Sequence, residues 1–248
     1  MKRSALIIGA PCEKGAKGYL PGVEADIANY KEYLTSPLGG FWRKDEIITL
    51  RNPSGNQVRS SLDTLKSSDY SMTVFCGHGY HSSEDDSTFI QINSNDEMDG
   101  KELRTGAKRR VIIYDCCREL TYRTVVEAYE RALKSEPPHL NAEECRYWYD
   151  QQIEKCPSAQ FILNACAIDE LSSEKSDRGG NYSSALLDSA DKWWRASTKD
   201  TRTKYKIFTV SEAHRIASGI VSSESDYLQN PQIEMPRTEV NFPFAVIA

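Results

Sequence analysis

Residues 110–118, with the sequence RVIIYDCCR, limit most strongly what this chain can fold into. The apolar run at residues 111–114 predicts a short strand buried on both faces, as in a parallel sheet covered by helices. The run stops at Asp115, and two cysteines and an arginine follow. In open α/β sheets, groups that handle ligands lie beyond the carboxyl ends of the strands, so a thiol here is placed for chemistry.

A second stretch of the same form lies upstream, at residues 72–79, with the sequence MTVFCGHG. It is again an apolar run, and it ends in a histidine, His78, between two glycines. A cysteine and a histidine at the ends of two separate buried strands suggest a nucleophile and its base.

The rest of the chain alternates short apolar runs with segments of helical periodicity. Alternation of this kind predicts an α/β fold, with a mostly parallel sheet covered on both faces, in one domain spanning residues 1–248. In the first helix Asp26 is expected away from the apolar face, and Pro243 favours a sheet edge for the last strand. Strands are predicted at 5–9, 46–50, 72–76, 111–114, 160–166 and 242–247, and helices at 23–34, 58–65, 182–194 and 212–221.

The connection at residues 119–158 is unusually long. Its pattern predicts one helix near residues 125–133 and a second at 142–154. A connection of this length is typical of a functional insert or a lid.

Composition excludes several classes of protein. The 248 residues carry a net charge of −5 and no concentrated basic tract, which argues against a nucleic-acid partner. No apolar stretch is long enough to span a bilayer, so no membrane partner is expected. The seven cysteines are odd in number and scattered without C-x-x-C spacing, which favours reduced thiols in the cytoplasm and no zinc site.

An ordered series of motifs resembles the caspase-like cysteine peptidases, and is closer to metacaspases and paracaspases than to animal caspases. The resemblance implies a three-layer α/β/α sandwich around a six-stranded sheet, and peptide-bond hydrolysis through a Cys–His dyad. It spans nearly the whole chain, through ALIIG, LPGVEADIANYKEYL, FCGHG, YDCCR, ILNACAIDELSSE, GGNYSSALL, QNPQI and FPFAVI.

The same resemblance implies roles for single residues. His78 matches the catalytic histidine and Cys117 the nucleophile, because the motif places the cysteine two residues after the aspartate. Asp115 matches the acid that lines the S1 pocket of enzymes that cleave after Arg or Lys, and Asp169 falls in the loop that supplies a second S1 acid. Glu119 departs from the Gly or small residue of many relatives, although paracaspase-type motifs also lack that glycine.

The chemistry of these residues suggests a mechanism. His78 could act as general base toward the thiol or as the acid that protonates the leaving amine. The N–H groups of Gly79 and Cys117 could form an oxyanion hole, in which one donor is typically worth ~3 kcal/mol. A carboxylate of Asp115 at a pocket floor prefers a cationic side chain, so cleavage is predicted after basic residues.

Two alternatives to an active peptidase stay open. One is a caspase fold without activity that serves as a scaffold or regulator. The other is a nucleotide-binding α/β module, for which the loop after the first strand contains glycines but matches neither G-x-G-x-x-G nor a P-loop.

The remaining expectations concern cofactors, partners and regulation. No cofactor is expected, with the reservation that some metacaspases need calcium, which the acidic residues 84–86 could bind. The partners expected are a protein or peptide substrate and a separately encoded activator, plausibly in a cell-death or defence pathway. Self-cleavage in the 119–158 insert is a further hypothesis. His81, His139 and His214 are expected at the surface or at helix caps.

Overall fold

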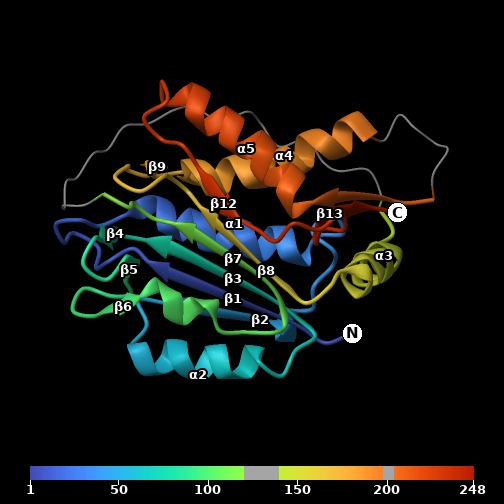
Figure 1. The fold of residues 1–248 in the computed structure, drawn as a ribbon, viewed down its shortest axis with the longest axis horizontal. Helices are drawn as coiled ribbons and strands as arrows, with labels where there is room; N and C mark the ends of the chain where they lie inside the picture. The colour runs from blue at the N-terminus through green and yellow to red at the C-terminus, as the bar shows by residue number, and fades with distance from the viewer. Residues whose placement is uncertain (120–139, 198–203) are drawn as a thin grey trace.

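A computed structural model describes residues 1–119, 140–197 and 204–248. Its centre is a six-stranded sheet with the order β12-β8-β7-β3-β1-β2, which confirms the predicted α/β class (Figure 1). All neighbouring pairs are parallel except β12 and β8. The strands are β1 (Arg3–Ala10), β2 (Ile47–Arg51), β3 (Tyr70–Gly77), β7 (Arg109–Asp115), β8 (Ala159–Asn164) and β12 (Gln232–Glu234).

The helices cover the two faces of this sheet unequally. On one face lie α1 (Pro21–Thr35), α4 (Asn181–Ser197) and α5 (Val210–Glu224), while α2 (Gly55–Leu65) lies on the other and α3 (Ala142–Lys155) packs near β13 at the end where the two chain termini lie (Figure 1). The side chains of β7 alternate accordingly: Val111 and Ile113 join the larger core, and Ile112 and Tyr114 the smaller one.

Short elements complete the chain. After β3 comes a small antiparallel sheet of β4 (Gly79–Ser82), β5 (Ser87–Gln91) and β6 (Glu97–Asp99), followed by the short helix η2 (Gly100–Arg104). Another short helix, η1 (Lys44–Glu46), precedes β2. Two two-stranded ribbons are formed by β9 (Glu174–Lys175) with β10 (Gly179–Gly180), and by β11 (Lys206–Thr209) with β13 (Pro243–Ile247).

Local sequence signals explain where several helices begin. Pro21 occupies the first turn of α1, where its missing N–H costs nothing. Capping boxes start α2, at Ser54 with Gln57, and α5, at Thr209 with Glu212. These signals account for the close agreement between the predicted helices and the observed ones.

Two expectations about position were wrong. Asp26 is buried in the α1 interface, and His81 and His214 are buried too, with only 7% of each histidine exposed. Burial lowers the pKa of His214 to about 4, and its Nδ1 lies 2.7 Å from the hydroxyl of Tyr182. A hydrogen-bonded histidine can therefore be a core residue. His139 and the predicted helix near 125–133 lie outside the described residues.

Two strands pair in a way that the sequence pattern did not predict. The strand at Pro243–Ile247 pairs with β11 in a separate ribbon, and the sixth strand of the central sheet is β12. The predicted helix at 142–154 is confirmed as α3. Among the described residues, no helix combines the length and apolar character needed to cross a bilayer.

Candidate active site

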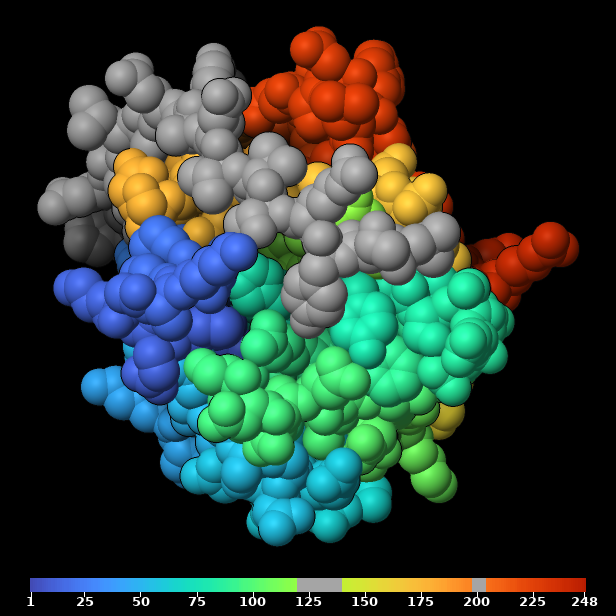
Figure 2. Space-filling view, turned by 90° about the vertical axis from the view of Figure 1, so that its left-hand side faces the viewer, coloured from blue at the N-terminus to red at the C-terminus, as the bar shows by residue number. Residues whose placement is uncertain are grey.

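The two predicted dyad residues follow neighbouring strands at equivalent positions. β3 and β7 are parallel, and Cys76 is paired with Asp115 at their carboxyl ends. His78 and Cys117 each lie two residues further along, at the edge where ligand-handling groups gather in such sheets. Figure 2 faces this edge, where segments that follow β1 (blue), β3 (teal) and β8 (yellow-orange) come together.

Cys117 is held by the backbone of Ser172, in the segment after β8. The Ser172 N–H donates to Sγ at 3.3 Å, and the thiol donates to the Ser172 carbonyl at 3.4 Å. Burial raises the pKa of the Cys117 thiol, and the charges of Asp115 and Glu119 add to that rise while the Ser172 N–H opposes it. The hydrogen bond to the Ser172 carbonyl requires Cys117 to be a neutral thiol in this arrangement.

His78 is also engaged with a backbone carbonyl. Its Nε2 lies 2.6 Å from the carbonyl oxygen of Gly18, in the loop after β1, so this nitrogen acts as a donor here. Gly18 has a φ of +89°, and a Cβ at this residue would lie 3.3 Å from Nε2. The glycine therefore serves the close approach of this loop to the imidazole.

Gly79 packs directly against the nucleophile segment. A Cβ at this position would lie 2.8 Å from the Cys116 sulfur and 3.0 Å from the Cys117 carbonyl oxygen. Cys116 itself is buried in the core on the α2 face, whereas Cys117 is partly exposed. Any side chain larger than hydrogen at residue 79 would push the histidine segment away from the cysteine segment. The predicted oxyanion role of the Gly79 and Cys117 N–H groups stays a prediction.

Asp115 lies beneath the predicted nucleophile, on the face covered by α1 and α4. Its carboxylate accepts hydrogen bonds from the Ser172 hydroxyl and the Ser183 N–H, both at 2.9 Å. Burial raises the pKa of Asp115, because only 6% of the residue is exposed and no cation compensates it among the described residues. Ser172 thus contacts both the predicted nucleophile and the predicted pocket acid.

Two further carboxyl groups flank Asp115, and sequence analysis missed both. Asp26 accepts the N–H of Gly180 at 3.0 Å, while a Cβ on Gly180 would lie 2.1 Å from an Asp115 oxygen. Burial, and then the charge of Asp115, raise the pKa of Asp26 well above its ordinary value. Burial raises the pKa of Glu174 to about 7, and Asp115 adds to that rise.

The sequence contained a weak signal for Asp26 and for the close packing at Gly180, but none for Glu174. Asp26 lies three residues after Val23 and four before Tyr30, both of which are buried, so helical spacing puts it on the inner face. The Gly179-Gly180 pair marks a place where other groups approach the backbone closely.

Asp169 occupies a different position from these three acids. It is exposed, has a φ of +68°, and its N–H donates to the Arg118 carbonyl at 2.9 Å. The structure thus brings together Asp115, Asp26 and Glu174, and leaves Asp169 at the surface. A substrate contact for Asp169 stays a prediction.

No group of three or more His, Cys, Asp or Glu residues suited to a metal ion occurs in the described part of the chain. In the acidic run, Asp85 accepts a hydrogen bond from the Ser82 hydroxyl, and Asp86 lies 3.7 Å from His81. A calcium requirement stays a prediction. All seven cysteines are free thiols.

Comparison with known protein families assigns the chain to one of them. The family model described as the caspase domain matches residues 2–242. A search of curated proteins found no match.

Proposed function

The chain belongs to the caspase-domain family of cysteine peptidases, and we propose that it is an endopeptidase that cleaves after Arg or Lys. Cys117 is the nucleophile, His78 the general base and acid, and Asp115 the acid that recognises the basic side chain. One observation carries the proposal: Ser172 holds the Cys117 sulfur through its backbone and hydrogen-bonds Asp115 through its hydroxyl.

The proposed pocket has the right electrostatics for a cation. Asp115, Asp26 and Glu174 are all acids with raised pKa values, and desolvation is the largest cause for each. Burial imposes a desolvation penalty on these three carboxyl groups. A guanidinium or ammonium group that binds beside them offsets part of that penalty. An aspartate side chain would instead add a like charge.

The proposed reaction begins with a neutral thiol. As the sulfur attacks the scissile carbonyl carbon, His78 takes the thiol proton, and the oxyanion accepts hydrogen bonds from Gly79 and Cys117 N–H groups. The C–N bond then breaks, and His78 returns the proton to the leaving amine. Water hydrolyses the resulting thioester, releasing the acid and restoring the thiol.

The resting contacts suggest that the enzyme is latent. Cys117 and His78 are each bound to a backbone carbonyl, at Ser172 and Gly18. Substrate binding or a separate activator must release both contacts before proton transfer between the pair. We include self-cleavage in the 119–158 insert, a cytoplasmic location, and a cell-death or defence role in the proposal as analogy.

The test uses fluorogenic peptides ending in Arg, Lys or Asp, with wild type, Cys117→Ala and the matched neighbour Cys116→Ala. We expect cleavage after Arg and Lys that is lost only in Cys117→Ala. Preference for Asp would contradict the role of Asp115. If wild type cleaves nothing, labelling by an arginine-directed, thiol-reactive probe decides: labelling of Cys117 supports a latent peptidase, and absence of labelling supports the inactive scaffold.

A further inference from the structure

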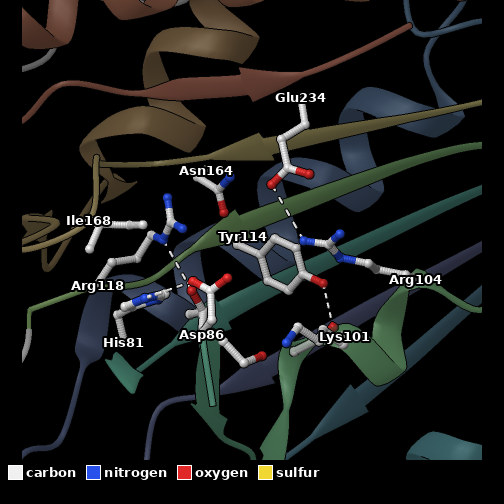
Figure 3. A pocket seen from close by; sticks show the side chains of 12 residues that line it. His81, Asp86, Lys101, Arg104, Tyr114, Arg118, Asn164, Ile168 and Glu234 are labelled. Atoms are coloured by element: carbon white, nitrogen blue, oxygen red, sulfur yellow. Dashed lines mark hydrogen bonds and ion pairs between the residues drawn. The ribbon is translucent and has the colours of Figure 1, made fainter. Parts of the chain in front are cut away.

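A second pocket lies on the opposite face of β7 from Asp115. It has a volume of about 310 Å³ and is floored by Tyr114 and Asn164 of the central sheet (Figure 3). Its walls come from the β4–β5 hairpin, from η2 and from Arg118, the residue after the nucleophile. Cys117, His78 and Asp115 do not line it, so this pocket is separate from the candidate active site.

Three cationic side chains line the pocket. Arg118 donates to the Thr88 hydroxyl at 3.1 Å and to the Cys166 carbonyl at 3.4 Å, and Lys101 donates to the Asp85 carbonyl at 3.0 Å. Within the described ranges, therefore, these two cations hydrogen-bond only to neutral oxygens. The third, Arg104, forms an ion pair with Glu234 at 3.4 Å.

The two acids at the pocket do not balance this charge. Asp86 is 94% exposed through its side chain, so water screens it, and Glu234 is the partner of Arg104. Arg118 and Lys101 thus form no ion pair with a carboxylate in the described part of the chain.

His81 adds a buried polar group with unused hydrogen-bonding capacity. Only 7% of the residue is exposed, and Nδ1 has no hydrogen-bond partner among the residues that the structure describes. Burial lowers the pKa of His81, and the charges of Arg118 and Lys101 lower it further against the opposing effect of Asp86. The field at this ring is therefore set more by cations than by acids.

We propose that this pocket binds a small oxyanion, a phosphate-like or carboxylate group, held by Arg118, Lys101 and His81. A guanidinium and an ammonium group with neutral partners supply charge-assisted hydrogen bonds to such a ligand. The polar floor and the volume suit a compact anion better than an extended apolar molecule.

The position of Arg118 gives the bound anion a structural consequence. The Arg118 N–H donates to the Glu170 carbonyl at 3.0 Å, and its carbonyl accepts from Asp169 at 2.9 Å. An anion on the Arg118 side chain would therefore also hold the segment that carries Cys117.

Isothermal titration of the full chain with sodium sulfate, against sodium chloride at equal ionic strength, tests the proposal. We expect saturable 1:1 sulfate binding that Lys101→Met weakens by about tenfold or more, since a charge-assisted hydrogen bond is lost. The matched control is Lys66→Met, an exposed lysine paired with Asp63 on α2, which should bind sulfate as wild type does. Parallel titrations with acetate and succinate distinguish a phosphate-like ligand from a carboxylate ligand. Binding of acetate or succinate in place of sulfate would assign a carboxylate ligand.

Three outcomes would overturn the proposal. They are no saturable binding of any of these anions, equal weakening by Lys66→Met, and unchanged binding by Lys101→Met. Lys101 is exposed, so its loss leaves the core intact. Binding to the folded protein can also be followed independently through the His81 ring resonances. These resonances should shift when the binding anion is added and should not shift when chloride is added.

Discussion

The two sides of β7 next to Cys117 carry opposite electrostatics. On the α1 and α4 side, Asp115 lies with Asp26 and Glu174, and burial raises the pKa of all three. On the other side, burial lowers the pKa of His81, and the charges of Arg118 and Lys101 lower it further. Alternation along one strand, with a period of two, places the acidic cluster and the cationic pocket on opposite faces of the sheet.

The comparison teaches how one short segment can contribute to two proposed recognition sites. Asp115 and Arg118 are three residues apart and lie on either side of Cys117 in the chain. Their side chains contact different elements, Ser183 of α4 for Asp115 and Thr88 of β5 for Arg118. A substitution at Asp115 should therefore leave anion binding at Arg118 intact, and the following predictions test that contrast between the two sites.

Asp115→Asn should produce the largest effect. It removes the charge that faces the proposed basic side chain, so kcat/KM for an Arg peptide should fall by about 10²–10³-fold, the usual cost of losing one partner of a buried charge pair. Sulfate binding in the second pocket should be unchanged. The measurements are steady-state hydrolysis and titration calorimetry, and an equal loss for a peptide with a neutral residue before the cut would contradict charge recognition.

Gly180→Ala should destabilise the structure around Asp115 through a steric clash, without any change of charge. Its Cβ would lie 2.1 Å from an Asp115 oxygen, and overpacking of this kind costs ~1–3 kcal/mol in the free energy of unfolding. The matched control is Gly219→Ala in α5, where a Cβ meets nothing within 4 Å and should stabilise by ~0.5–1 kcal/mol. Urea unfolding measures both, and equal stability of the two variants would show that Gly180 does not need to be small.

Glu174 should make recognition of Arg pH-dependent. Burial raises the pKa of Glu174 to about 7, so the proposed acidic pocket gains negative charge, and with it affinity for a cation, as the pH rises through 7. The ratio of kcat/KM between wild type and Glu174→Gln for an Arg peptide should increase ~3–10-fold from pH 6 to pH 8. Taking this ratio cancels the titration of groups common to both proteins. A ratio that does not vary with pH would show that the charge of Glu174 does not contribute to recognition of the substrate.

The titration of His81 in the cationic pocket should have the smallest effect. The charged groups that face it are Arg118, Lys101 and Asp86. A bound anion favours the protonated imidazole, so sulfate affinity should rise as the pH falls, by ~2–3-fold between pH 7.5 and 5.5. His81→Asn should abolish this dependence, and a persistent slope in that variant would assign the titration to another group.

Much of the fold could be predicted because its signals are local. The apolar runs ending at Cys76 and Asp115, the capping residues Ser54 and Thr209, and the helical spacing in α2 each depend on neighbours in the chain. Parallel pairing of β3 with β7 then brings the two strand ends that carry His78 and Cys117 to one edge of the sheet.

The features that only the tertiary structure decided depend on contacts between segments that are distant in the chain. Asp26 and Gly180 are separated by 154 positions, and only their hydrogen bond turns a helix residue into part of the acidic pocket. His81 likewise becomes a buried ring because the β4–β5 hairpin folds back beside Arg118. Local periodicity reports which way a side chain points within its own element, but the burial of that side chain, and hence its pKa, depends on which other elements pack against it.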